Sequence, residues 1–193
     1  MFELQPSARV SMKTGTLYAI TGNLGWIFYG QVTPEKDIGF FRRRGHDLAD
    51  PLDVLSTPVM SVVTVAYPSI TRALRSGIWK NMGIFPVAEA LTKPISRVQW
   101  SVGTLRVTVW TAGSHYDTRV DDAAIQGMEL MAVWDAEWHV PGRLTADFGA
   151  EEAEWHVGGP IRRERQIKEE LARRAPDRPE HELPDDWVPT SVR

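Results

Sequence analysis

A run of closely spaced strand-like segments, residues 13–44, constrains the fold of this chain more than any other feature. Residues 16–20 and 26–32 are rich in β-branched and aromatic side chains, and residues 38–41 continue the pattern. Glycine and asparagine in the first turn tolerate the positive φ of a tight hairpin, and a proline in the second turn fixes φ early. We therefore expect three consecutive antiparallel strands.

The middle segment of this run carries large apolar groups on both of its faces. Trp26 and Phe28 fall on one face, while Ile27 and Tyr29 fall on the other, because side chains alternate along a strand. A strand that is apolar on both faces is covered on both sides. The sequence therefore predicts an α+β fold, mostly antiparallel, with a strongly bent β-sheet or small barrel and a few short helices.

The rest of the chain adds further elements to this scaffold. Residues 59–67 are almost wholly apolar and predict a central strand. The alternation of apolar and polar residues around Gly103 predicts a hairpin with one buried face. We expect that hairpin at residues 97–102 and 105–111, helices at residues 69–75 and 121–133, and loops at residues 45–58 and 112–118.

The C-terminal part predicts one charged helix followed by a tail. Pro160 suits the first turn of a helix, and opposite charges recur four residues apart up to Arg174. The Pro-rich, charged segment that follows predicts a flexible tail. Met12 is a second plausible start, so residues 1–12 are expected to form an N-terminal extension. We expect a single α+β domain at residues 13–159, followed by the helix at residues 160–174 and the tail at residues 175–193.

Composition excludes several classes of protein. The 193 residues are 42% hydrophobic and 24% charged, as in ordinary folded domains. A net charge of −3 argues against a generic phosphate-backbone binder, and the absence of cysteine excludes disulfides and cysteine-ligated zinc. No secretory apolar region opens the chain, and no run approaches the ~20 apolar residues of a membrane span. We expect a cytoplasmic protein without membrane partners.

One repeated segment suggests a metal site as an alternative interpretation. The sequence DAEWHVPG at residues 135–142 returns as EAEWHVGG at residues 152–159. If both copies were paired strands, their carboxylates and imidazoles would share one face, as metal ligands do. The simpler interpretation buries Trp138 and Trp155 and leaves their polar neighbours in water, so no cofactor is expected. The metal ligands in the alternative are Glu137, His139, Glu154 and His156.

Other reactive groupings are incomplete. Ser114, His115 and Asp117 supply pieces of a hydrolytic site, as does the pair His46 and Asp47. Neither a Gly-x-Ser-x-Gly nucleophile turn nor a glycine-rich phosphate loop accompanies them. Polar loop residues explain these groups better, so we expect no enzymatic activity.

Three consecutive arginines form the one basic cluster in the sequence. Arg42, Arg43 and Arg44 follow Phe40 and Phe41 and precede His46. Such a cluster contacts a nucleic-acid backbone or an acidic protein surface, and a solvated strand end is the simpler alternative. Because no wider basic excess surrounds it, nucleic acid is the less favoured partner.

Two stretches resemble the immunity protein 26 family of bacterial polymorphic toxin systems. The first is KTGTLYAI at residues 13–20 with WIFYGQV at residues 26–32, and the second is SGIWKNMG at residues 76–83. The resemblance covers about residues 13–95 and consists of aromatic and glycine positions. It implies a cytoplasmic, non-catalytic protein that binds a cognate toxin and blocks it.

The resemblance carries no contact residues, so the toxin-facing positions are chosen from the sequence. Shape, aromatic anchors and charge complementarity matter to such a protein more than reactive groups do. The net negative charge suits a basic toxin such as a nuclease. The alternatives are a metal-dependent hydrolase, a nucleic-acid-binding β-barrel and a structural subunit. The predicted partner-binding residues are Arg42, Arg43, Arg44, His46, Asp47, Asp50 and Asp53.

Overall fold

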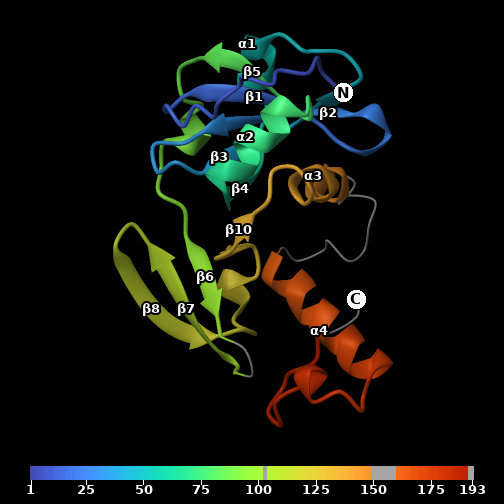
Figure 1. Cartoon of the computed structure of the whole chain (residues 1–193). Helices are drawn as coiled ribbons and strands as arrows, with labels where there is room; N and C mark the ends of the chain where they lie inside the picture. Colours follow the sequence, from blue (N-terminus) through green and yellow to red (C-terminus); the bar gives the residue numbers. More distant parts are fainter. Residues whose placement is uncertain (102–103, 149–159, 191–193) are drawn as a thin grey trace. The chain divides into compact units, whose positions relative to one another are not determined.

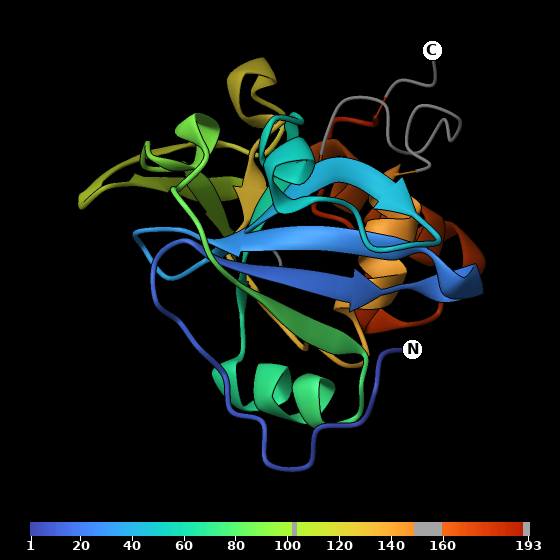
Figure 2. The same ribbon diagram turned by 90° about the horizontal axis from the view of Figure 1, so that it is seen from above.

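The computed structural model describes residues 1–101, 104–148 and 160–190 (Figures 1 and 2). These residues form two compact units. The described residues of unit 1 are 1–94 and 132–148, and those of unit 2 are 95–101, 104–131 and 160–190. The fold is α+β, as predicted. Residues 13–159, predicted as a single domain, are divided between the two units.

Unit 1 is built on a six-stranded sheet with the strand order β10-β4-β3-β2-β1-β5. Its neighbouring strands are antiparallel, except that β10 runs parallel to β4. The predicted meander is confirmed as β1, β2 and β3, whereas β4 lies next to the two-residue edge strand β10 rather than at the centre. The strands are β1 (Thr16–Thr21), β2 (Ile27–Val32), β3 (Ile38–Gly45), β4 (Val59–Val65), β5 (Trp79–Ile84) and β10 (Val133–Trp134).

Both faces of this sheet are buried, as its apolar pattern predicts. All six residues of β2 are buried. One face packs Phe28 and Trp79 into the main core, with the helices α2 (Tyr67–Arg75) and α3 (Val140–Phe148) contributing to it. On the other face Leu91 lies so close to β3 that a Cβ built on Gly39 would stand 2.3 Å from its side chain. Register shifts in three of the strand pairs bend the sheet between these layers.

The segment at residues 45–58, predicted as a loop, contains a short helix, α1 (Pro51–Leu55). Asp50 caps this helix, since its Oδ1 accepts a hydrogen bond of 2.8 Å from the Leu52 N–H. Pro51 supplies the fixed φ that suits a first turn. Asp50 and Pro51, predicted as loop residues, therefore begin a helix.

The N-terminal extension lies against unit 1. The Phe2 N–H donates to the Gly77 carbonyl at 2.8 Å, and the Ser11 N–H donates to the Tyr18 hydroxyl at 2.9 Å. Gly77 follows α2 with φ of +72°, the left-handed conformation that ends many helices. No helix in the described ranges combines the length and the apolar character that crossing a bilayer requires.

Unit 2 contains a four-stranded sheet with the order β8-β7-β6-β9. The predicted hairpin is confirmed as β6 and β7, but residues 112–118, predicted as a loop, contain the strand β8. Because β8 is an exposed edge strand, it needs no apolar face, and the sequence pattern that marks a strand is missing. The strands are β6 (Arg97–Trp100), β7 (Arg106–Thr111), β8 (Ser114–Arg119) and β9 (Glu129–Leu130).

The helix predicted at residues 121–133 is wrong. The structure has instead a single 3-10 turn, η3 (Ala123–Ile125), followed by β9 and β10. The Asp122 carboxylate caps that turn by accepting from the Ala124 N–H at 2.9 Å. Leu130 then pairs with Val98 of β6, so strand pairing with a distant segment overrides a weak helical pattern.

The charged helix predicted at residues 160–174 is confirmed as α4 (Pro160–Arg174). Ile161, which is fully buried, joins Val107 and Val109 in the core of unit 2. Two of the predicted charge pairs form: Glu164 with Lys168 at 3.5 Å, and Glu170 with Arg174. A narrow apolar stripe thus docks an otherwise solvated helix.

The described part of the predicted tail returns along α4. One oxygen of Glu169 accepts hydrogen bonds from the Trp187 indole N–H at 2.9 Å and from the Thr190 N–H and hydroxyl at 2.6 and 2.8 Å. Arg165 donates to the Val188 carbonyl at 2.7 Å. The Trp187 ring stacks on Trp100 of β6 with a centroid distance of 6.1 Å. A single carboxylate thus gathers most of these contacts.

Replacing Glu169 with alanine is expected to release residues 187–190 from α4. Three donors lose their shared acceptor, and each such hydrogen bond contributes about 0.5–1.5 kcal/mol. Amide hydrogen exchange at Thr190 should accelerate at least about 10-fold, since 1.4 kcal/mol corresponds to one factor of ten. Glu164→Ala, which removes only an exposed ion pair, is the control. Unchanged exchange at Thr190 in Glu169→Ala would show that the tail is held by other contacts.

Candidate partner-binding surface

The three arginines at positions 42–44 lie within β3 and do not form one cluster. Because side chains alternate along a strand, Arg42 and Arg44 share one face and Arg43 the other. The guanidinium carbons of Arg42 and Arg44 lie 5.6 and 4.3 Å from the ring centroid of Phe148 in α3. Arg43 instead lies near the Tyr29 hydroxyl, whose pKa it acts to lower. Each face therefore has its own charged groups.

Four side chains on the first face form a continuous layer, which we call the aromatic stack: Trp26, Arg44, His46 and Phe148. The guanidinium of Arg44 lies between two rings, 4.4 Å from the Trp26 centroid and 4.3 Å from the Phe148 centroid. Trp26 also stacks on His46, with centroids 3.9 Å apart and an interplanar angle of 26°. Trp26, Arg44 and Phe148 are half-buried and His46 is exposed, so the stack is ordered and reaches solvent.

An acidic segment continues from the stack, and we call residues 47–53 the acidic loop. Asp47, Asp50 and Asp53 are exposed, and none of them forms an ion pair within the described part of the chain. Between them Leu48 and Leu52 are 43% and 69% exposed. The loop thus presents apolar side chains framed by carboxylates.

The acidic loop is anchored to the sheet by Tyr29 of β2. The Tyr29 hydroxyl accepts from the Ala49 N–H at 2.7 Å and donates to the Asp47 carbonyl at 3.3 Å. Burial raises the pKa of this phenol, so it keeps its proton and its donor role at neutral pH. The cap of α1 by Asp50 orders the other end of the loop. The exposed groups are therefore held in a fixed arrangement.

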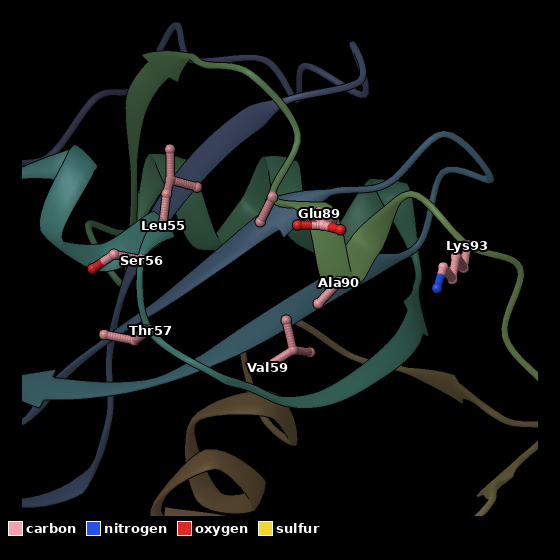
Figure 3. A pocket seen from close by; sticks show the side chains of 8 residues that line it. Leu55, Ser56, Thr57, Val59, Glu89, Ala90 and Lys93 are labelled. Atoms are coloured by element: carbon pink, nitrogen blue, oxygen red, sulfur yellow. The ribbon is translucent and has the colours of Figure 1, made fainter.

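A shallow pocket of about 430 Å³ opens beside the end of α1 (Figure 3). The hydroxyls of Ser56 and Thr57 donate to the backbone carbonyls of Asp53 and Val54, each at 2.7 Å. They are thus occupied in closing the helix and are not aimed at a base. The lining combines apolar groups with one acid and one base, which suits an accessory recess for a partner's side chain. It consists of Leu55, Ser56, Thr57, Val59, Ala88, Glu89, Ala90 and Lys93.

The metal prediction depended on strands that the first repeat does not form. Residues 135–139 make a turn that leads into α3, so the strand prediction is wrong for this copy. Glu137 is paired with Arg72 at 3.4 Å, and His139 is exposed. Glu154 and His156 lie outside the described residues. Across the parts of the chain that are described, no three potential ligands gather to hold a metal ion.

The hydrolytic grouping at residues 114–117 does not assemble either. The Ser114 hydroxyl donates to the Thr111 carbonyl at 2.8 Å. Asp117 accepts from Thr108 at 2.7 Å and from Arg106 at 2.5 Å, and these two donors lower the pKa of its carboxyl. The His115 ring packs on Trp110. Each group has a structural partner in place of its supposed catalytic one.

The position of Phe148 and the exposure of Trp138 are two features of unit 1 that the sequence did not predict. Phe148 belongs to the aromatic stack only because α3 packs beside β3, and no local pattern signals that contact. Trp138, expected to be buried, is 76% exposed. The turn that exposes Trp138 could have been predicted from Asp135, three residues earlier, because an aspartate side chain often accepts from the backbone of a turn.

These observations define two exposed features of unit 1: the aromatic stack with its cationic Arg44, and the acidic loop with its apolar Leu48 and Leu52. No protein-family model, curated protein or solved structure matches this chain. Function is therefore inferred from the chemistry of the surface, which suits recognition of another macromolecule.

Proposed function

We propose that this protein binds a cognate protein toxin in the cytoplasm and neutralises it without catalysis, as an immunity protein does. The observation that carries the proposal is the anchored acidic loop, which exposes Leu48 and Leu52 among three carboxylates. Exposed apolar groups held in a fixed frame are typical of binding surfaces. The resemblance of residues 13–95 to immunity protein 26 supports the same interpretation.

The charge of the loop favours a basic partner. Asp47, Asp50 and Asp53 carry no intramolecular ion pair in the described ranges, so a partner's lysines or arginines can pair with them. Rim charges of this kind accelerate association and select partners more than they add affinity. A nuclease toxin, which must itself bind phosphates, has a suitably basic surface.

The aromatic stack supplies the anchor residues that such an interface needs. Arginine and tryptophan are enriched among residues that dominate binding energy, and here Arg44 is already fixed between Trp26 and Phe148. Ordering these side chains before binding lowers the entropic cost of association. His46 stacks on Trp26 and directly precedes Asp47 in the chain, so the stack and the acidic loop are contiguous in sequence and we propose that one partner contacts both.

The experiment that tests the proposal begins with tagged full-length protein. We expect it to copurify one toxin domain in a fixed ratio and to protect cells in which that domain is expressed. Copurification without protection would contradict neutralisation. A complex with single-stranded nucleic acid, weakening steeply with salt, would support the nucleic-acid alternative instead.

Removing the charges of the acidic loop is expected to slow association with the toxin. The variant Asp47→Asn, Asp50→Asn, Asp53→Asn keeps the helix cap, because asparagine also caps. The association rate should fall about 10-fold at low salt, and the difference should shrink at high salt, because screening removes the same attraction. Stopped-flow or surface-binding kinetics measure this rate.

A control with the same change in net charge separates the loop from overall electrostatics. Glu3, Glu35 and Asp177 are exposed acids outside the proposed surface. Their replacement by Gln, Gln and Asn should leave the association rate within about 2-fold, since distant charges are screened. Equal slowing in both triple variants would show that net charge, and not the acidic loop, steers the toxin.

A further inference from the structure

We infer that Trp138 is an anchor by which unit 1 inserts into an apolar pocket of its protein partner, an inference that rests on the proposed function. Its side chain is 76% exposed, whereas Trp79 in the same unit is 1% exposed. A tryptophan offers a large apolar area and one N–H donor, and such residues are enriched at the centres of interfaces.

The exposure of Trp138 does not come from a loose loop. One carboxylate oxygen of Asp135 accepts from the N–H groups of Glu137 and Trp138, both at 2.9 Å. The Asp135 carbonyl accepts from the N–H groups of His139 and Val140 at 3.1 and 3.0 Å. These four bonds fix the backbone on both sides of the indole.

The turn is also attached to the body of unit 1. The second carboxylate oxygen of Asp135 pairs with Arg72 of α2 at 2.7 Å. The Ala136 N–H donates to the Ser69 hydroxyl at 2.8 Å, and the Ala136 carbonyl accepts from the buried Trp79 indole at 2.9 Å. The turn that carries Trp138 is thus bonded to the rest of unit 1 by Arg72, Ser69 and Trp79.

The indole of Trp138 itself is uncommitted. Among the described residues its ring makes no stacking or cation–π contact, and its N–H donates to no acceptor. Trp110, which is also exposed, differs because its N–H donates to Gln99 at 3.1 Å and its ring contacts His115. An ordered, exposed and uncommitted indole is ready to enter a pocket that offers an acceptor.

The charges beside Trp138 point to a protein with a basic rim. Asp135 and Glu137 lie beside Trp138 in the chain, and Arg72 is their shared cationic partner, so these three groups carry an excess of one negative charge. An anionic membrane surface or a nucleic-acid backbone would be repelled by these carboxylates. A protein pocket with a lysine or arginine at its edge fits both the ring and the charge.

Trp138 also lies within reach of the surface already proposed. It precedes α3, whose last residue, Phe148, belongs to the aromatic stack. Nine residues of helix span about 13 Å at 1.5 Å per residue. Because a standard interface covers about 800 Å² on each partner, one partner can contact both ends of α3.

The decisive measurement compares Trp138→Ala with Trp110→Ala in binding to the purified toxin, using the full chain in each case. Trp138→Ala should raise Kd at least about 30-fold, as truncation of an anchor does. Trp110→Ala, the same substitution at an exposed tryptophan of unit 2, should change Kd less than about 3-fold. Trp138→Phe, which keeps a ring but loses the donor, should fall between them. Thermal unfolding of Trp138→Ala should match that of the unaltered chain, because the lost side chain is exposed.

The outcomes separate this inference from the function on which it rests. If the unaltered chain and Trp138→Ala bind the toxin equally well, the inference fails and the proposed function stands. If the unaltered chain forms no complex with the toxin, both fail. A shift of Trp138 emission on adding vesicles of phosphatidylcholine and phosphatidylserine, absent in Trp138→Ala, would assign the residue to a lipid surface and overturn the inference.

Discussion

Replacing Trp79 with alanine is expected to lower the free energy of unfolding by about 3–5 kcal/mol, as truncation of a large buried aromatic residue does. The side chain is 1% exposed, and its ring lies 5.3 Å from that of Tyr18 in the core of unit 1. Its indole N–H donates to the buried Ala136 backbone at 2.9 Å. The variant therefore leaves both a cavity and an acceptor without its donor.

Chemical denaturation followed by circular dichroism measures this loss. Trp138→Ala is a matched control, because the same substitution at an exposed site should change the free energy of unfolding by less than about 0.5 kcal/mol. A loss below about 1 kcal/mol in Trp79→Ala would mean that the core closes over the missing ring. Since Ala136 belongs to the turn that presents Trp138, Trp79→Ala should also weaken binding to the partner.

Breaking the buried ion pair between Arg143 and Asp147 is expected to cost a similar amount. The Arg143 Nε and the Asp147 Oδ2 are 2.9 Å apart, and both side chains are 7% exposed. The Arg143 guanidinium also lies 4.5 Å from the ring centroid of Trp134. Breaking a buried ion pair by removing one partner is strongly destabilising, so Asp147→Ala should lose about 3–5 kcal/mol.

Two further variants test whether the loss comes from breaking this buried ion pair. The double variant Arg143→Met, Asp147→Leu should recover most of the stability, because neither charge is then buried. Glu164→Ala, which breaks an ion pair with side chains 37% and 34% exposed, should cost less than about 0.5 kcal/mol. If Asp147→Ala costs no more than Glu164→Ala, the pair is effectively solvated and the reasoning from burial is wrong.

The sequence predicts the elements that are encoded by neighbouring residues. β1, β2 and β3 are consecutive strands joined by turns whose glycine, asparagine and proline residues mark them. The apolar groups on both faces of β2 further indicate a sheet that is covered twice. α4 follows from Pro160 and from charges spaced at four residues.

Elements that depend on distant pairing could not be predicted in the same way. β9 and β10 contain two residues each, and each is a strand only because it pairs with a distant segment: β9 with β6, and β10 with β4. β8 has no apolar face, since it is an exposed edge. In each case the decisive contact lies far along the chain, where periodicity carries no information.

In the candidate surface, too, some features could be predicted from neighbouring residues and others depend on distant contacts. The exposed carboxylates at 47, 50 and 53 could be predicted from a polar, proline-containing segment. The separation of Arg43 from its two neighbours follows from strand alternation, once β3 is known to continue through Gly45. The part played by Phe148 could not be predicted, because it requires the placement of α3 against β3.

The order of the chain implies an order of events during synthesis. Unit 1 is interrupted by residues 95–131 and is completed by residues 132–148. Until those residues leave the ribosome, the nascent sheet lacks Ala136, Val140 and Leu144, which cover its main core. At about 5–20 residues per second this wait lasts on the order of several seconds. A ribosome-bound chain therefore exposes an apolar sheet face that a chaperone can bind, and its surface for a partner is finished only when α3 emerges.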